Sequence, residues 1–135
     1  MSKIGPFELD RHFAHLRADA TADVLEVNEN FWQELSQGRF GNFQEEYLVS
    51  TLSFAEHWPV WEMHPQGDEI VVLLSGSLEL IFEKKSGHKT ITLSTLASWA
   101  LVPKGVWHTA RVHEPATVLF ITPGDGTLQR PLDLL

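Results

Sequence analysis

The 135-residue chain contains no cysteine, and it has only 10 lysine and arginine residues against 18 aspartate and glutamate residues. Without cysteine there is no disulfide, no thiolate nucleophile and no cysteine-type zinc site, so histidines and carboxylates are the only strong metal ligands. The formal net charge of −8 at pH 7, with histidine counted as neutral, disfavours binding to nucleic acid or to an anionic membrane surface. We therefore expect neither partner.

Long apolar runs and linker-like stretches are also missing. No apolar run approaches the roughly 20 residues that a membrane-spanning helix needs. The first residues, MSKIGPFELDRHF, lack the apolar core of a signal peptide, and these two absences predict a cytoplasmic protein. No repeat, low-complexity tract or linker divides the chain, whose length suits one sizeable core, so we predict a single domain over residues 1–135.

Residues 1–44 differ in character from the rest and are predicted to be a mostly helical extension. The segment VNENFWQEL (27–35) predicts a short helix, with Asn28 as its N-cap and Gly38 just past its end. An earlier helix is predicted from apolar residues at helical spacing, which are Leu9, Phe13, Leu16 and Ala20.

Residues 45–123 have the composition of short strands separated by turns. The turns predicted inside this region include Ser75-Gly76, which would close a hairpin, and a break at 113–115. Turns every eight to twelve residues are typical of an antiparallel sandwich or barrel. Residues 124–135 contain too many turn residues for regular structure and are predicted to be a tail over the barrel or a neighbouring subunit. The predicted strands are YLVSTLSF (47–54), EIVVLL (69–74), LELIFE (78–83), KTITLS (89–94), SWALVP (98–103), VWHTARV (106–112) and ATVLFIT (116–122).

Three groups that bind metals or move protons stand at the start of the aliphatic stretch. Glu62 and His64 are two residues apart, so both point to the same face of an extended chain. Residues 65–68 predict a turn that brings Glu69 back beside His64. About forty residues further on, His108 follows a tight turn and is flanked on its own face by small apolar residues, so it is expected to point inward. In isolation, such a histidine is more often a hydrogen-bonded core residue than a metal ligand.

Two motifs carry a resemblance to a known family. The stretch EMHPQGDEIVVLLSG (62–76) resembles the first motif of the cupin superfamily, with His64 and Glu69 at its ligand positions. The stretch PKGVWH (103–108) resembles the second motif and ends in the third ligand position, His108. The resemblance covers roughly the latter two-thirds of the chain.

This resemblance implies an all-β double-stranded β-helix, a small jelly-roll barrel, here with short N-terminal helices. It implies one divalent metal ion per chain, Fe, Mn, Ni or Zn, held inside the barrel by His64, Glu69 and His108. Similarity to small single-domain cupins also implies a homodimer.

The sequence departs from the family pattern at three positions. Ala97 stands where the second motif often has glycine, and Val112 stands where it ends in asparagine, but these changes concern turns and packing. Glu62 stands where the first motif usually has a histidine. Glu62 is therefore a fourth metal ligand, a general acid or base beside the metal, or a side chain that faces solvent, and the sequence leaves all three open.

The resulting functional prediction is a metal-dependent enzyme acting on a small polar molecule inside the barrel, of oxygenase or of isomerase, epimerase or lyase type. The alternative is a non-catalytic module that binds or senses a small molecule. A vestigial site, in which the inward polar residues pair with one another without metal, is the structural alternative. Trp99 and Phe120 are predicted to point inward, whereas His12 and His15 are predicted at the surface of the first helix.

Overall fold

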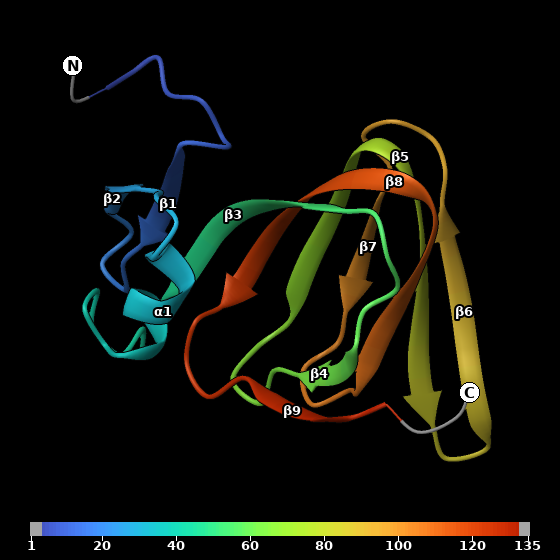
Figure 1. The fold of residues 1–135 in the computed structure, drawn as a ribbon. Coiled ribbons are helices and arrows are strands. Elements are labelled where there is room, and N and C mark those ends of the chain that lie inside the picture. Colours follow the sequence, from blue (N-terminus) through green and yellow to red (C-terminus); the bar gives the residue numbers. More distant parts are fainter. Residues whose placement is uncertain (1–3, 133–135) are drawn as a thin grey trace.

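The computed structural model describes residues 4–132 of the chain (Figure 1). Strands dominate this part of the chain, as predicted, and they form one antiparallel nine-stranded sheet. The elements are β1 (His12–Leu16), β2 (Ala22–Glu26), α1 (Phe31–Ser36), β3 (Tyr47–Phe54), β4 (Val60–Met63), β5 (Glu69–Lys84), β6 (Gly87–Leu93), β7 (Trp99–Val102), β8 (His108–Pro123) and β9 (Leu128–Pro131).

Two long strands, β5 and β8, organise the barrel. They pair with each other along most of their length. On its other edge β5 pairs with β6 and β7, whereas β8 pairs with β3 and β4. In Figure 1 the long strands curve around the interior, and β4 and β9 lie across one end. This arrangement is the all-β jelly roll that the sequence predicts.

The main core lies inside this barrel. Alternate residues of β5 and β8 face inward, as the two-residue period of a strand requires, among them Val71, Leu73, Leu80, Val118 and Phe120. Full burial of each large apolar side chain contributes roughly 1.5–3 kcal/mol to folding.

The predicted hairpin turn at Ser75-Gly76 is wrong, as is the predicted break at 113–115. Both β5 and β8 run through these positions as continuous strands, with bulges between Leu73 and Glu79. Gly76 has a φ of +76°, and a Cβ on it would lie 1.9 Å from the carbonyl oxygen of Pro115. Gly76 is therefore required because the two bent strands approach each other closely at this point. A glycine in the sequence is equally compatible with a tight turn, so the residue type alone does not distinguish the two structures.

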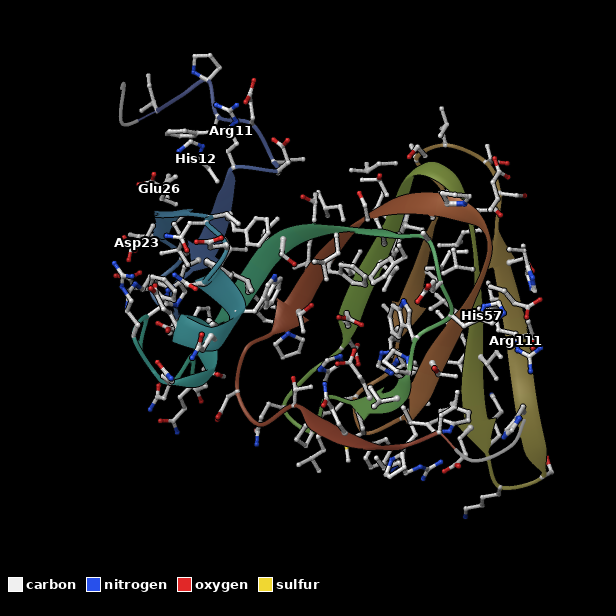
Figure 2. The ribbon with its side chains drawn as sticks, viewed as in Figure 1. Arg11, His12, Asp23, Glu26, His57 and Arg111 are labelled. Atoms are coloured by element: carbon white, nitrogen blue, oxygen red, sulfur yellow. The ribbon has the colours of Figure 1, made fainter. Side chains whose placement is uncertain are left out.

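The first predicted helix is also wrong, because His12–Leu16 forms strand β1. β1 pairs with β2 on one edge and with β3 on the other, and it buries Phe13 and His15 on one face. His15 is therefore fully buried, so its predicted surface position is wrong. His12 is partly buried and lies with β1 and β2, away from the barrel (Figure 2). Pairing with a distant strand outweighs the helical spacing of the apolar residues.

Only the second predicted helix forms, so residues 1–44 are not mostly helical. α1 begins after Asn30, not after the predicted cap Asn28, whose side chain instead accepts a 2.9 Å hydrogen bond from the N–H group of Asn30. Gly38 lies just past the end, as predicted, with a φ of +82°. Among the described residues no helix has the length and apolar character needed to cross a membrane.

The tail contains a strand that the sequence prediction missed. β9 pairs with β4 in antiparallel register. Its Arg130 lies over the rings of Trp61, at 5.2 Å, and Trp107, at 4.7 Å, and forms an ion pair with Glu83. These contacts hold residues 128–131 against the barrel, whereas residues 133–135 lie outside the described part.

Candidate metal centre

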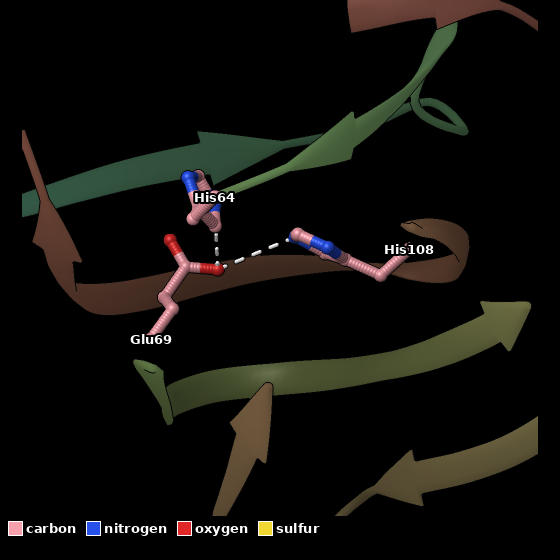
Figure 3. A group of neighbouring side chains, drawn as sticks. All are labelled: His64, Glu69 and His108. Carbon is pink, nitrogen blue, oxygen red and sulfur yellow. Dashed lines mark ion pairs between the residues drawn. The ribbon is translucent and has the colours of Figure 1, made fainter. Parts of the chain in front are cut away.

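The three predicted ligands converge inside the barrel (Figure 3). His64 follows β4, Glu69 begins β5 and His108 begins β8, and one potential ligand atom from each lies within 4.8 Å of the other two. Oε1 of Glu69 is 3.4 Å from Nε2 of His64 and 3.3 Å from Nε2 of His108. Residues forty positions apart in the chain thus face one point.

Two hydrogen bonds donated by backbone N–H groups hold the turns that present these side chains. The N–H group of Gly105 donates to the carbonyl oxygen of His64 at 3.0 Å. The N–H group of Lys104 donates to the carboxylate of Asp68 at 2.7 Å. The turn between β4 and β5 is therefore bonded to the turn before β8, which fixes the two motifs relative to each other.

Further hydrogen bonds orient the three side chains. The Thr122 hydroxyl donates to Oε2 of Glu69 at 2.6 Å, so Oε1 is the oxygen that faces the histidines. Nδ1 of His108 lies 3.3 Å from the carbonyl oxygen of Val106, which can only accept, so Nδ1 carries a proton and Nε2 is the nitrogen available to a metal. Nδ1 of His64 is hydrogen-bonded to the Thr127 hydroxyl at 2.9 Å. Such contacts orient metal-binding histidines and carboxylates in proteins.

The facing atoms form no hydrogen bond among the described residues and lie near one another only at ion-pair distance. Nε2 of His64, Nε2 of His108 and Oε1 of Glu69 are buried and form no hydrogen bond. Their mutual contacts of 3.3–3.4 Å are longer than a good hydrogen bond, whereas a cation bound between the three atoms would satisfy all of them. Two imidazoles and one carboxylate are a ligand set for first-row divalent ions. The residues present therefore fit a bound divalent metal ion.

The electrostatics of the group agree with this. Burial raises the pKa of Glu69, but the contacts from His108 and His64 outweigh it and lower the pKa to about 2. Burial lowers the pKa of His64, but the Glu69 carboxylate and, to a smaller degree, the charge of Glu62 outweigh it and raise the pKa above 6.5. Glu69 is thus ionised at neutral pH, and a proton on His64 must leave before Nε2 can bind a metal.

Glu62 lies beside the group but outside it. It is the direct cross-strand partner of His108, so both side chains lie on the same face of the sheet. It lines the same cavity as His64, and its Oε2 accepts a 3.1 Å hydrogen bond from Gln129. Trp61 and Met63 are not among the cavity residues, as the predicted alternation along β4 requires.

The cavity has a volume of about 1210 Å³ and extends from the metal-binding group to the end of α1. Phe120 lines it, as predicted, whereas Trp99 is 56% exposed, so its predicted inward position is wrong. Sequence reasoning missed Thr122, although its spacing of two from Phe120 on one strand indicates the same face. It also missed Thr127, for which the sequence contains no signal, since the contact depends on the tail folding back.

No family model and no curated protein sequence matches the chain. Among solved structures it is similar to a cupin-2 domain-containing protein from Shewanella frigidimarina NCIMB 400, with 26% identity, a TM-score of 0.50, and coverage of 57% of this chain and 70% of the other. The 135-residue chain therefore has the cupin fold.

Two enzymes share this cupin fold at lower identity. Hydroquinone 1,2-dioxygenase from Sphingomonas sp. TTNP3 is 18% identical, with a TM-score of 0.50 over 59% of this chain and 60% of that enzyme. Bacillus subtilis oxalate decarboxylase, which has Mn(II) centres, is 18% identical, with a TM-score of 0.50 over 64% of this chain and 23% of that enzyme. At these identities the likeness concerns the fold alone.

Proposed function

We propose that this cupin binds one divalent metal ion through His64, Glu69 and His108 and is a metal-dependent enzyme that acts on a small molecule in the cavity. The observation that carries the proposal is the set of three buried atoms that face one point and form no hydrogen bond among the described residues. Two structural neighbours that are enzymes, one of which has Mn(II) centres, support it.

The chain's own residues suggest a division of roles. A divalent ion held by these ligands supplies Lewis-acid polarisation of a substrate oxygen or, if it is iron, a centre for oxygenase chemistry. Thr122 and Thr127 orient Glu69 and His64, and the apolar side chains around the cavity limit access of water. Glu62 is the proton-transfer group, because it faces the same cavity from the strand position opposite His108 and lies outside the ligand group.

The reaction is of oxygenase type or of isomerase, epimerase or lyase type. Iron or manganese suits the site better than copper, since Glu69 among the ligands and Glu62 beside them make a hard and negatively charged environment, and nickel and zinc are also compatible with it. A non-catalytic binding protein would hold the same metal but would not depend on Glu62 for any turnover.

Elemental analysis of untagged protein purified without chelator tests the metal site. We expect about one divalent ion per chain, and its loss in His64→Ala and in His108→Ala, because each variant removes one of three ligands. The control is His113→Ala, since His113 is exposed and lies on the far side of β8. A folded His64→Ala or His108→Ala variant with full metal content would show that the ligand assignment is wrong.

We also expect a homodimer. Trp99 and Leu101 of the short strand β7 are 56% and 46% exposed, and β7 pairs only with β5 among the described strands. A second copy that covers these side chains would remove them from water. Light scattering should give twice the chain mass of 15.3 kDa, and Trp99→Ser should shift it toward the monomer. A monomer at high protein concentration would contradict this expectation.

A further inference from the structure

The side chains that line the cavity carry more negative than positive charge. Among the described residues that line it, none is lysine or arginine, and four carry carboxylates: Glu56, Glu62, Glu69 and Asp125. The lining includes His57, but Nδ1 of His57 accepts a 2.8 Å hydrogen bond from the N–H group of Val112. That nitrogen therefore carries no proton, so the ring is neutral. Arg111 lies near His57 in Figure 2 but is not a cavity residue.

This balance disfavours anionic ligands. Proteins that recognise carboxylates or phosphates usually supply arginine or lysine for the purpose. Here a divalent ion offsets two of the four carboxylate charges and leaves the cavity negative, in a protein whose net charge is also −8. Entry of an anion through the cavity is therefore disfavoured relative to entry of an uncharged or cationic molecule of the same size.

Aromatic rings form the side of the cavity next to the metal ligands. The centroid of Trp58 lies 5.4 Å from that of Phe54 and 6.1 Å from that of Phe120, and Phe54 and Phe120 meet edge to face at 6.1 Å. The Trp58 ring also lies edge-on to His108 at 6.1 Å. These three rings line the cavity up to the metal-binding group, and a ligand ring packs on such a surface in stacked or edge-to-face geometry.

Trp58 provides a second sign of a ligand. Its side chain lines the cavity, and its buried Nε1–H group has no acceptor among the described residues. An indole N–H group can only donate, and a buried donor without a partner is rare. A hydroxyl or carbonyl oxygen on a ligand is an acceptor of the kind that this group lacks.

We propose that the cavity takes an uncharged or cationic aromatic molecule, of the phenol, aryl alcohol or arylamine class, and discriminates against carboxylates and phosphates. The inference rests on the proposed function for the metal beside the ring, and it narrows the predicted small polar substrate to an aromatic one. Cationic members gain further from the aromatic faces and from the carboxylates.

Calorimetric titration of the metal-loaded protein at low salt with four matched probes tests this. Benzyl alcohol, benzylamine and benzoate share a ring and differ in charge, whereas cyclohexylmethanol lacks aromaticity. We expect benzyl alcohol and benzylamine to bind at least tenfold more tightly than benzoate, and cyclohexylmethanol to bind more weakly than benzyl alcohol. Benzoate binding as tightly as benzyl alcohol, or no binding of any aromatic probe, would overturn the inference.

Variants assign the effect to the cavity. Trp58→Leu and Phe54→Leu should each weaken benzyl alcohol binding several-fold, and thermal unfolding identifies whichever variant stays folded. Val24→Ala is the control and should bind as the parent does, because Val24 is exposed on β2 and lies outside the cavity. The double variant Glu56→Gln/Asp125→Asn should strengthen benzoate binding several-fold while benzyl alcohol binding is unchanged. Unchanged benzyl alcohol binding in a folded Trp58→Leu variant would contradict the proposed location.

Metal content measured on the same sample separates this inference from the proposed function. One metal ion per chain without aromatic binding contradicts only the inference. Aromatic binding by a protein that takes up no metal supports the inference and contradicts the proposed function.

Discussion

At the scale of single residues, the two carboxylates of the site differ in environment. Glu69 is buried, accepts a hydrogen bond from Thr122 and faces two imidazoles. Glu62 is partly buried and is bonded to the exposed Gln129. A buried carboxylate that is oriented by a hydrogen bond and by neighbouring imidazoles suits metal binding. A carboxylate that remains partly in contact with solvent can exchange protons.

Glu62→Gln separates the possible roles of this side chain. The substitution keeps the size and the hydrogen-bonding capacity but removes the charge and the basic oxygen. We expect metal content to stay near one per chain and turnover to fall about 10²–10⁴-fold, as for loss of a general acid or base. Elemental analysis and an activity assay on the same sample provide the measurements. Loss of metal would instead identify Glu62 as a ligand, and unchanged turnover would identify it as a bystander.

Ala97 shows how a family departure is accommodated. It stands where the second motif often has glycine, and its φ of +66° lies in the left-handed region that glycine adopts without strain. The backbone turn is thus retained with an alanine in it, so the departure changes the local strain and not the path of the chain.

At the scale of elements, the bend shared by β5 and β8 depends on Gly76. We expect Gly76→Ala to destabilise the protein by roughly 2–4 kcal/mol, since the new Cβ would overlap the Pro115 carbonyl oxygen and alanine would be strained at a φ of +76°. Denaturant unfolding of the purified protein measures this.

Gly38→Ala is the matched control for this prediction. Gly38 has a similar φ of +82°, but a Cβ there would meet nothing within 4 Å. We therefore expect only the backbone strain, about 1 kcal/mol. Equal losses in the two variants would show that the close contact between the strands does not limit stability.

The segments around the metal-binding group are positioned partly by local turns and partly by the pairing of β9 with β4. β9 pairs with β4, and the segment that leads into it brings Thr127 to His64. Local spacing identifies His64 and Glu69 as neighbours because a turn of four residues joins them. It does not identify Thr127, which lies 63 residues from His64.

At the scale of the whole molecule, metal and pH are expected to act on stability together. In the metal-free protein the raised pKa of His64 contributes stability below pH 6.5, and this contribution is lost as the pH rises through the folded-state pKa. The lowered pKa of Glu69 contributes stability above about pH 4.5, which is lost as the pH falls toward 2. The two shifts place the greatest stability of the metal-free protein between these limits.

Near neutral pH, metal binding should reverse the loss of stability that the metal-free protein shows as the pH rises. Binding to the native state stabilises it, and it releases the proton of His64, so the apparent affinity rises with pH below the raised pKa. Thermal unfolding at pH 6 and pH 8, with chelator and with added metal, measures both effects. We expect the Tm difference between metal-loaded and metal-free protein to be larger at pH 8. A difference that is independent of pH would show that His64 does not exchange a proton for the metal.

The sequence by itself determined the β-rich character of residues 45–123, the strand at 47–54, the second helix and the position of Glu69 beside His64. Strand alternation, short turns and residue chemistry act over a few positions, so these features can be deduced locally. That His108 joins the same group was implied by the resemblance to the two cupin motifs and not by local spacing.

Only the tertiary structure decided the state of residues 12–16, the course of the chain through Gly76 and the partners of Thr127. Each depends on a contact with a distant segment: β1 with β3, Gly76 with Pro115, and the tail with β4. The absence of lysine and arginine from the cavity is likewise a property of which side chains the fold gathers, because the chain has ten of them and places none in the described lining. Pairing between distant segments outweighs the local preference for helix, strand or turn, and this pairing cannot be deduced from the spacing of residues along the sequence.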